Sequence, residues 1–540
     1  MKRNIIIIMA MMIAMQLSAA ADGTYKSIIS EYTLSADGGI TQKVSKVLKY
    51  NTHHSFFKLF GETFVVFNPE FQTIKVDTSY TVQKDGTVIK TPANAFNYVL
   101  PSMAAKAPDY NKLTELVISH TGLELGATAY LEYTVTTQPG VYGSLDIDEV
   151  IGVQGADIDK YQVIVNVPEG TTLRWSLTDS KVKPSVKGGR YVWTFTGVKS
   201  AKGETDTPCG YGGVPHLSAT SSASLADNLV PLTIETRDLR RVPREYLDGA
   251  DSDALRADAI QKYIVKGLGN CGVPPYLTGN CVRQCGRVMW TAYGTEAEKA
   301  LAMARLMRAE GLEAQAVVAF PAAQEVKSIR NISEYMVLCG GRLLSVRTLG
   351  ESPLKWRPSQ YAVYDLAGNA IDLPSADTEI TLDGKVALSA QKALQEIRYS
   401  VTPARGKDDA FDGTVNLASN NGYVTYTLPS PAAGCVDKWN ILRLNKERTA
   451  AFAIPYAISE KNEYVITLDA VRSVTKSVSK SIRNSVGSVS VSVANENGKI
   501  IVKRSISLHQ DVIPTGKYRE FYEIMRLWNN PAYRTVVVKE

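Results

Sequence analysis

The first part of the chain alternates between apolar and polar positions in short runs. The run from Thr73 to Val82 shows the alternation clearly, and the runs 130–135 and 161–167 continue it. Turn residues such as Asp85 and Gly86 separate the runs. A period of two residues places alternate side chains on opposite faces of a strand. The pattern therefore predicts an N-terminal antiparallel β-sandwich with one buried face per strand.

The spacing of apolar residues becomes helical after about residue 250. Residues 253–266 place several apolar side chains near one stripe, which predicts a helix that ends at Gly267. A second helix is predicted from Thr295, because Thr295 and Glu298 have the spacing of a capping box and Gly311 can end the helix. Strands then resume at 314–320, 336–338 and 343–346. The centre of the chain is therefore predicted to mix helices and strands.

Strands dominate again from about residue 380. The clearest are 423–428, 488–493 and 500–503, and Asn495–Gly498 between the last two is a hairpin signal. One helix is predicted at 516–528, before a last strand. The C-terminal part is expected to be a β-sandwich with one terminal helix.

The N-terminus has the order of a secretory signal. Lys2 and Arg3 precede an apolar stretch, Ile5–Met15, and small residues follow at Ala19–Ala21. No cysteine stands at a lipobox position, and no later apolar run approaches the roughly 20 residues that span a bilayer. We expect a signal peptide at 1–21 and a periplasmic or secreted protein without a membrane span.

Composition and charge limit the kinds of molecule that the chain is expected to bind. The chain has 540 residues, of which 44% are hydrophobic and 21% charged, as in ordinary globular proteins. Without Lys2 and Arg3 the formal charge falls from +6 to +4 (6 − 2), which is small for this length. No nucleic-acid partner is expected. Six cysteines allow disulfides or free thiols, and no histidine near Cys271, Cys281 and Cys285 completes a zinc site. No metal and no cofactor are predicted.

Three stretches resemble a family of secreted bacterial transglutaminase-like proteins. They are 107–126, 294–320, and the segment from 484 through the last hairpin to the terminal helix. In that family a domain of unknown function precedes a transglutaminase-like core, and a second β-domain often follows. The resemblance implies a multidomain α+β fold with a papain-like centre. The implied domains are a β-sandwich at 22–236, a transglutaminase-like domain at 237–376 and a β-rich domain at 377–540.

The same resemblance implies that the catalytic site is degenerate. Active members would use a Cys-His-Asp triad, whose positions here fall on Glu296, near Tyr335, and near Ser345 or Val346. No histidine occurs between residues 217 and 508. A thiol needs a base or a strongly electropositive site to act as a nucleophile near neutral pH. We therefore predict no catalytic residues, and treat Glu296, Tyr335 and Ser345 as candidates for a pocket.

Four further residues are candidates for a functional role. Trp356 and Tyr364 follow the central strands and could line a groove, although aromatic residues there also suit core packing. Cys209 and His216 could form a pair, but nothing marks the thiol as activated. The leading hypothesis is a non-catalytic protein that binds a peptide, cell-wall or glycan ligand. The alternatives are an enzyme with unidentified catalytic residues, and a structural envelope component.

Overall fold

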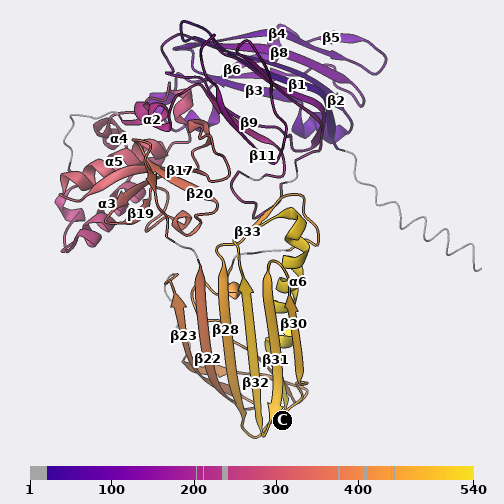
Figure 1. The fold of residues 1–540 in the computed structure, drawn as a ribbon, viewed down its shortest axis with the longest axis vertical. Helices are drawn as coiled ribbons and strands as arrows, with labels where there is room; N and C mark the ends of the chain where they lie inside the picture. Colours follow the sequence, from indigo (N-terminus) through magenta and orange to yellow (C-terminus); the bar gives the residue numbers. More distant parts are fainter. Residues whose placement is uncertain are drawn as a thin grey trace, which may run out of the picture.

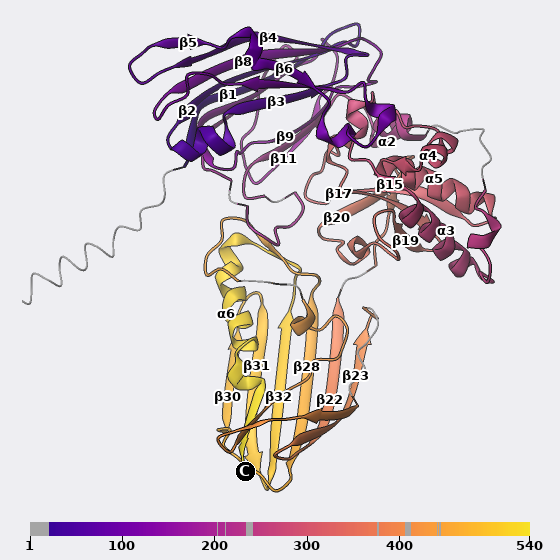
Figure 2. The same ribbon diagram turned by 180° about the vertical axis from the view of Figure 1, so that it is seen from behind.

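The computed structural model describes residues 21–540 except 202, 211, 234–240, 375–376, 406–411, 440 and 442–443. Three regions follow one another along the chain (Figure 1). The N-terminal strands lie at one end and the C-terminal strands at the other, while the central helices lie to one side (Figures 1 and 2). The expected signal peptide lies almost entirely outside the described residues. No described helix is long and apolar enough to cross a membrane.

The N-terminal region is built on an eight-stranded sheet with the strand order β12-β13-β10-β1-β2-β8-β4-β5. Its inward face carries the apolar members of each alternating run, and Trp193, Tyr50 and Val163 there are fully buried. The strands are β1 (Gly23–Leu34), β2 (Ile40–Tyr50), β4 (Gln72–Val82), β5 (Val88–Lys90), β8 (Thr128–Thr137), β10 (Ala156–Asn166), β12 (Ser185–Lys187) and β13 (Arg190–Val198).

Two three-stranded sheets accompany this large sheet. One has the order β3-β7-β6 and the other β11-β14-β9. A short π-helix, η1 (Ser55–Leu59), connects β2 to β3. The strands are β3 (Glu62–Phe67), β6 (Phe96–Val99), β7 (Thr114–Ser119), β9 (Asp146–Val150), β11 (Arg174–Thr178) and β14 (His216–Thr220).

The central region packs helices on a five-stranded antiparallel sheet of order β19-β18-β17-β20-β21. Helix α5 lies against β17 and β18, because its Ala300, Met303 and Met307 meet the apolar residues of those strands. The helices are α2 (Leu225–Leu229), α3 (Asp253–Gly267), α4 (Cys285–Thr291) and α5 (Glu296–Ala309). The strands are β17 (Ala314–Pro321), β18 (Glu334–Cys339), β19 (Arg342–Ser345), β20 (Tyr361–Asp365) and β21 (Ala370–Ile371), with a parallel two-stranded pair of β15 (Gly269–Asn270) and β16 (Tyr293–Gly294).

The C-terminal region contains a seven-stranded sheet of order β24-β23-β22-β28-β32-β31-β30 and a four-stranded sheet of order β25-β26-β34-β29. Every second residue of β22 is buried, as the alternating sequence requires. Helix α6 (Tyr518–Trp528) covers part of the large sheet with Phe521, Ile524 and Trp528 (Figure 2). The strands are β22 (Thr378–Leu388), β23 (Lys392–Thr402), β24 (Gly413–Asn416), β25 (Ser419–Asn420), β26 (Tyr423–Thr427), β28 (Ile458–Leu468), β29 (Arg472–Ser473), β30 (Val478–Arg483), β31 (Gly487–Glu496), β32 (Lys499–Leu508) and β34 (Thr535–Lys539), with a separate pair of β27 (Phe452–Ala453) and β33 (Val512–Ile513).

The expected fold class, a multidomain α+β protein with a papain-like centre, is wrong. Strands make up 43% of the chain and helices 18%, and the strands form eight sheets in the described part. The strand pairing also departs from purely antiparallel sandwiches, because β1 pairs with β10 and β22 with β28 in parallel. A parallel pair needs a long crossover connection, which a period of two residues along one strand cannot reveal. The molecule is a β-rich protein of several sheets.

The domain boundaries remain predictions. The expected boundary at 236–237 lies within the undescribed segment 234–240, and the boundary at 376–377 lies beside the undescribed residues 375–376.

Candidate functional site

The first turn of α5 brings two carboxylates to one end of a buried helix. Thr295 is the N-cap: its Oγ1 accepts a hydrogen bond from the Glu298 amide at 3.2 Å, and Glu298 Oε2 accepts one from the Thr295 amide at 2.9 Å. The capping box expected from the sequence is therefore confirmed. Free N–H groups and the positive end of the helix dipole favour negative charge here. Glu296 and Glu298 share this turn but have different partners.

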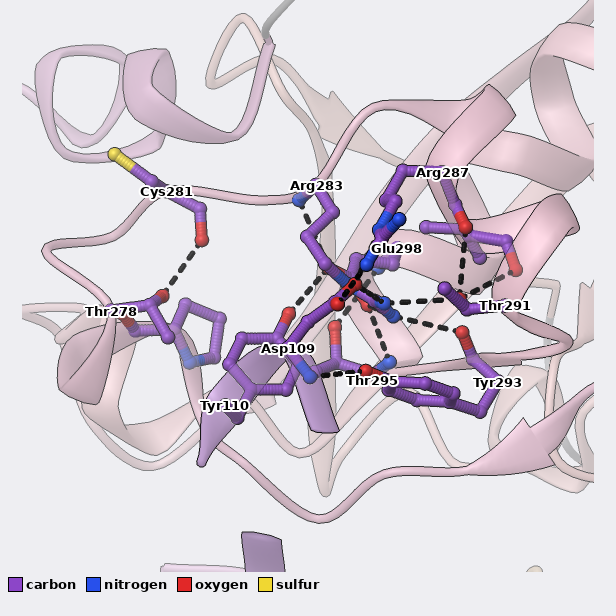
Figure 3. Close-up of polar contacts among 12 residues, drawn as sticks. Asp109, Tyr110, Thr278, Cys281, Arg283, Arg287, Thr291, Tyr293, Thr295 and Glu298 are labelled. Atoms are coloured by element: carbon purple, nitrogen blue, oxygen red, sulfur yellow. Dashed lines mark hydrogen bonds and ion pairs between the residues drawn. The ribbon is translucent and has the colours of Figure 1, made fainter. Parts of the chain in front are cut away.

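Glu298 is buried in an ion-pair network (Figure 3). Its Oε1 accepts hydrogen bonds from the Tyr110 hydroxyl and from the Arg283 amide and Nε, the last two at 2.9 Å. Its Oε2 accepts a further bond from Arg283 Nη2 at 2.9 Å. Both oxygens are thus occupied, so the buried carboxylate has its hydrogen-bonding needs met within the folded chain.

Arg283 connects the helix to the N-terminal region. Its Nη1 donates to Asp109 Oδ2 at 2.7 Å, and its guanidinium lies 4.2 Å from the centre of the Tyr293 ring. Burial lowers the pKa of Arg283, but the carboxylates of Glu298 and Asp109 raise it more strongly. Hydrogen bonds from Arg287, and then Arg283, hold the pKa of Asp109 well below its usual value. We call Asp109, Tyr110, Arg283, Arg287 and Glu298 the latch, because they join η4 (Pro108–Tyr110) to α4 and α5.

Glu296 is on the open side of the same turn, where 35% of its side chain is exposed. Arg347 Nε donates to Glu296 Oε1 at 2.6 Å and Arg347 Nη2 to Oε2 at 2.8 Å. This is the two-point arrangement in which a guanidinium binds a carboxylate most specifically. Arg347 Nη2 also donates to the Ser333 carbonyl at 3.0 Å, so the chain holds the guanidinium in place. The hydrogen bonds to Glu296 raise the pKa of Arg347.

A cavity of about 550 Å³, including its open mouth, lies next to Glu296. Tyr335 is part of its wall, and burial raises the pKa of that phenol, with a smaller contribution from the charge of Glu296. Arg330 lies at the same cavity, and its guanidinium is 4.7 Å from the centre of the Tyr276 ring. No described carboxylate lies within 4 Å of the side-chain nitrogens of Arg330, although the charge of Arg330 acts on the buried Asp146. The cavity therefore contains one carboxylate that is paired with Arg347 and one cation without an ion-pair contact among the described residues.

Cys271 supplies a thiol to this cavity, but not an activated one. Burial raises its pKa, which lowers the fraction of thiolate near neutral pH. All residues that line the cavity lie between Cys271 and Tyr335, a stretch that contains no histidine. All six cysteines are free thiols, and no three described His, Cys, Asp or Glu side chains are placed to share a metal ion.

The other predicted site residues do not line this cavity. Ser345 is buried, and its hydroxyl donates to Glu334 Oε1 at 3.0 Å and accepts from the Arg347 amide at 3.1 Å. Trp356 lies in η9 (Pro353–Trp356), and Tyr364 packs on Phe320 with ring centres 5.9 Å apart. Glu296 and Tyr335 thus share the cavity, whereas Ser345, Trp356 and Tyr364 are not among the residues that line it.

Cys209 and His216 do not bond to each other in the structure. Cys209 Sγ contacts Ser333 Oγ at 3.4 Å, and burial raises the pKa of the thiol. His216 Nε2 instead pairs with Asp148 Oδ1 at 2.8 Å. Sequence reasoning missed Arg347, Arg330 and the latch. The one available signal was that Arg347 directly follows the strand expected to carry the third triad position.

The fold and this site place the chain in a class of β-rich proteins with uncharacterised flanking domains. Residues 36–202 match a domain of unknown function, DUF3857, and residues 423–538 match a second, DUF3858. A crystal structure described as a putative protease from Parabacteroides distasonis ATCC 8503 is 30% identical, covers 97% of this chain and 100% of its own, and has a TM-score of 0.74. The chain belongs to the same family as that protein.

The remaining comparisons add little. Structures of an M1 zinc metallopeptidase from Deinococcus radiodurans and of its E323A mutant are 9% identical and have TM-scores of 0.17; they cover 45% and 54% of this chain, and 53% and 72% of their own. Scores this low support no argument about function. No curated protein matches the chain. The matches support the flanking domains of the expected resemblance and a protease-like relative, but not its transglutaminase-like part.

Proposed function

We propose that this chain is a non-catalytic member of the family, periplasmic or secreted, that binds a peptide in the cavity beside Glu296. The observation that supports this most is the two-point ion pair between Glu296 and Arg347 at the start of α5. In a cysteine enzyme with a nucleophile at this position, the helix end would favour a thiolate. Here a carboxylate occupies the helix end, and both of its oxygens accept hydrogen bonds from Arg347.

The charges of the cavity favour a peptide over a neutral glycan. Arg330 has no ion pair with a described residue and stacks on Tyr276, so it can bind a carboxylate. Each oxygen of Glu296 accepts one hydrogen bond from Arg347 and has a second lone pair, so the exposed part of the carboxylate can bind an ammonium or guanidinium beside Arg347. A peptide that ends in lysine or arginine offers both groups on one residue. The peptide part of a cell-wall fragment presents related chemistry.

The rival hypothesis is that the chain is a protease, as the description of its relative suggests. A cysteine protease would have to use Cys271 here, since it is the one thiol among the described residues that line the cavity. Its raised pKa and the lack of a nearby histidine argue against that role. The export of the protein is proposed from the basic and apolar start of the sequence.

The test combines turnover and binding. Purified protein is incubated with casein and with an amine-donor substrate, before and after thiol alkylation, and we expect no turnover. Equilibrium dialysis against tryptic peptides of casein, read by mass spectrometry, should show retention of peptides with C-terminal lysine or arginine. Glu296→Gln and Arg330→Gln should each weaken retention roughly tenfold, the equivalent of one charge-assisted hydrogen bond.

Glu313→Gln is the matched control, because Glu313 is exposed in the turn after α5 and does not line the cavity. It should leave retention unchanged. Casein hydrolysis that alkylation or Cys271→Ser abolishes would establish the protease instead. Equal retention by the parent protein and Glu296→Gln would refute the proposed site.

A further inference from the structure

The inward face of β2 contains a lysine where the pattern calls for an apolar residue. Val44, Leu48 and Tyr50 on this face are all buried, and Lys46 lies between them in the alternation. Its neighbours across the sheet are Ile28 on β1 and Leu131 on β8, both buried. A lysine stem can pack against such residues, but its ammonium needs water or a partner. The position of Lys46 therefore needs an explanation.

Lys46 lines a cavity between the large sheet and β3. The cavity measures about 610 Å³ when the open space at its mouth is included. Most of its wall is apolar or aromatic, and includes Tyr25, Leu48, Tyr50 and Phe60. It does not share a lining residue with the cavity beside Glu296. The two cavities are therefore separate features of the molecule.

No described carboxylate pairs with the Lys46 ammonium within 4 Å. Glu149, whose charge acts on Lys46, instead accepts hydrogen bonds from the hydroxyls of Tyr32 and Tyr161. Glu62, at the edge of the cavity, is exposed and accepts one from Ser119 Oγ at 3.0 Å. Lys46 thus lines the cavity without a described carboxylate in ion-pair contact, and Glu149 acts on its charge only from a greater distance.

The other basic group of the cavity adds no charge near neutral pH. His120 Nε2 contacts Thr63 Oγ1 at 3.1 Å, and burial, helped by the charge of Lys46, lowers the pKa of the ring to about 4. At the edge of the cavity Phe64 is 56% exposed, and Phe57 and Leu59, just before Phe60, are 73% and 38% exposed. The exposed edge of the cavity therefore has both an aromatic ring, Phe64, and the carboxylate of Glu62, and it leads to a single cationic group.

We propose that this cavity binds a small carboxylate with an apolar body, such as a medium-chain fatty acid. The carboxylate would pair with Lys46, and the body would lie against Tyr25, Leu48 and Phe60. An anion held by a lysine in an apolar site forms a strong, charge-assisted hydrogen bond. The apolar body gains from leaving water in proportion to the area that it buries. Neither the two domains of unknown function nor the protease-like relative assigns a ligand to this part of the chain.

Titration calorimetry with three probes of equal length tests this inference. Octanoate should bind roughly tenfold or more tightly than octanol, since only octanoate can pair with the ammonium. Octylamine should bind more weakly than octanol. Lys46→Met keeps the length of the side chain and removes its charge, so octanoate should lose its advantage over octanol while octanol still binds.

Lys43→Met is the matched control. Lys43 is on the other face of the same strand, where it pairs with Glu132 at 2.9 Å, and its loss should leave octanoate binding unchanged. A second variant, Leu131→Trp, fills the cavity without changing its charge and should weaken all three probes. Equal binding of octanoate and octanol to the parent protein would overturn the inference. So would octanoate binding that Lys46→Met leaves intact or that Lys43→Met abolishes.

Discussion

Glu298 and Lys46 are both charged side chains on the inward side of their elements, but only one of them has partners. Glu298 accepts hydrogen bonds from Arg283, Tyr110 and the Thr295 amide, whereas Lys46 has no ion pair with any described residue. A buried charge is costly unless it is paired and hydrogen-bonded. The latch meets that condition within the folded chain, and the cavity of Lys46 does not. We therefore infer that Glu298 stabilises the fold and that Lys46 binds a ligand.

In the cavity beside Glu296, one charged group has an ion-pair partner among the described residues and another does not. Its carboxylate is paired with Arg347, yet 35% of the side chain is exposed and a cation, Arg330, is left without an ion pair among the described residues. The latch holds the adjacent Glu298 to the N-terminal region through Tyr110 and Arg283 (Figure 3). The same helix turn is thus fixed on one side and open on the other, which suits a rigid binding site.

The largest change in the free energy of unfolding should come from Glu298, the charge that has partners. Glu298→Ala removes the acceptor for Arg283 and Tyr110 and leaves the guanidinium buried beside fewer carboxylates. Breaking a buried pair on one side costs about 3–5 kcal/mol. The free energy of unfolding, from urea titration followed by tryptophan fluorescence, should fall by that amount. Glu296→Gln, two residues earlier, is the control and should change it by less than about 1 kcal/mol. Equal decreases in the free energy of unfolding for the two variants would show that Glu298 and Glu296 do not differ in their contribution to stability.

Asp109→Asn tests the part of the latch that crosses between regions. Asp109 accepts charge-assisted hydrogen bonds from Arg283 and Arg287, so the variant should lose about 1.5–3 kcal/mol near pH 7. Because the folded-state pKa of Asp109 is depressed, its contribution is present above its unfolded pKa of about 4 and is lost as pH falls further. The difference between parent and variant, measured by urea titration at several pH values, should therefore shrink below about pH 4. If the difference does not change with pH, the contribution of Asp109 to stability does not depend on the charge of its carboxylate.

Sequence patterns predicted those features that depend on neighbours along the chain. The capping box of Thr295 and Glu298 needs only a spacing of three residues, and the structure contains it. The partners of the same residues come from far away: Tyr110 is 188 positions from Glu298, and Arg347 is 51 from Glu296. One sequence gives no signal for such pairs. The cavity of Lys46 was missed for a related reason, because the opposing β3 is not identifiable as its cover from local pattern.

The fold class was predicted wrongly because the helical segments in the centre of the chain are few compared with the strands that surround them. The resemblance emphasised residues 294–320, whereas the long strands on either side determine the overall class. Alternation at 161–167 predicted a strand in what is now β10, but the pattern is the same for parallel and antiparallel partners. Sheet order depends on crossover connections, which the pattern within a strand does not encode.

Thr295→Ala should have a smaller effect than either change in the latch. It removes one hydrogen bond to the Glu298 amide but leaves the carboxylate of Glu298 in place. Loss of an N-cap costs about 0.5–2 kcal/mol. A thermal melt should show a lower midpoint, and Thr295→Ser should restore most of the loss. An unchanged midpoint in Thr295→Ala would mean that the latch alone fixes the helix end.

Lys46→Met should have the smallest effect on stability, and of opposite sign. Removal of an ammonium that lacks a partner should raise the free energy of unfolding by about 0.5–1 kcal/mol near pH 7, at the low end for stabilising substitutions. Burial lowers the folded-state pKa of Lys46, so its charge opposes folding at neutral pH and stops doing so as pH rises through the unfolded value of about 10.4. The gain, measured by urea titration, should therefore vanish near that pH. Saturating octanoate should reverse the order at pH 7, since it binds the protein that retains the ammonium more tightly and therefore stabilises it more. A loss of stability in Lys46→Met without ligand would show that Lys46 is partnered after all, and the contrast with Glu298 would fail.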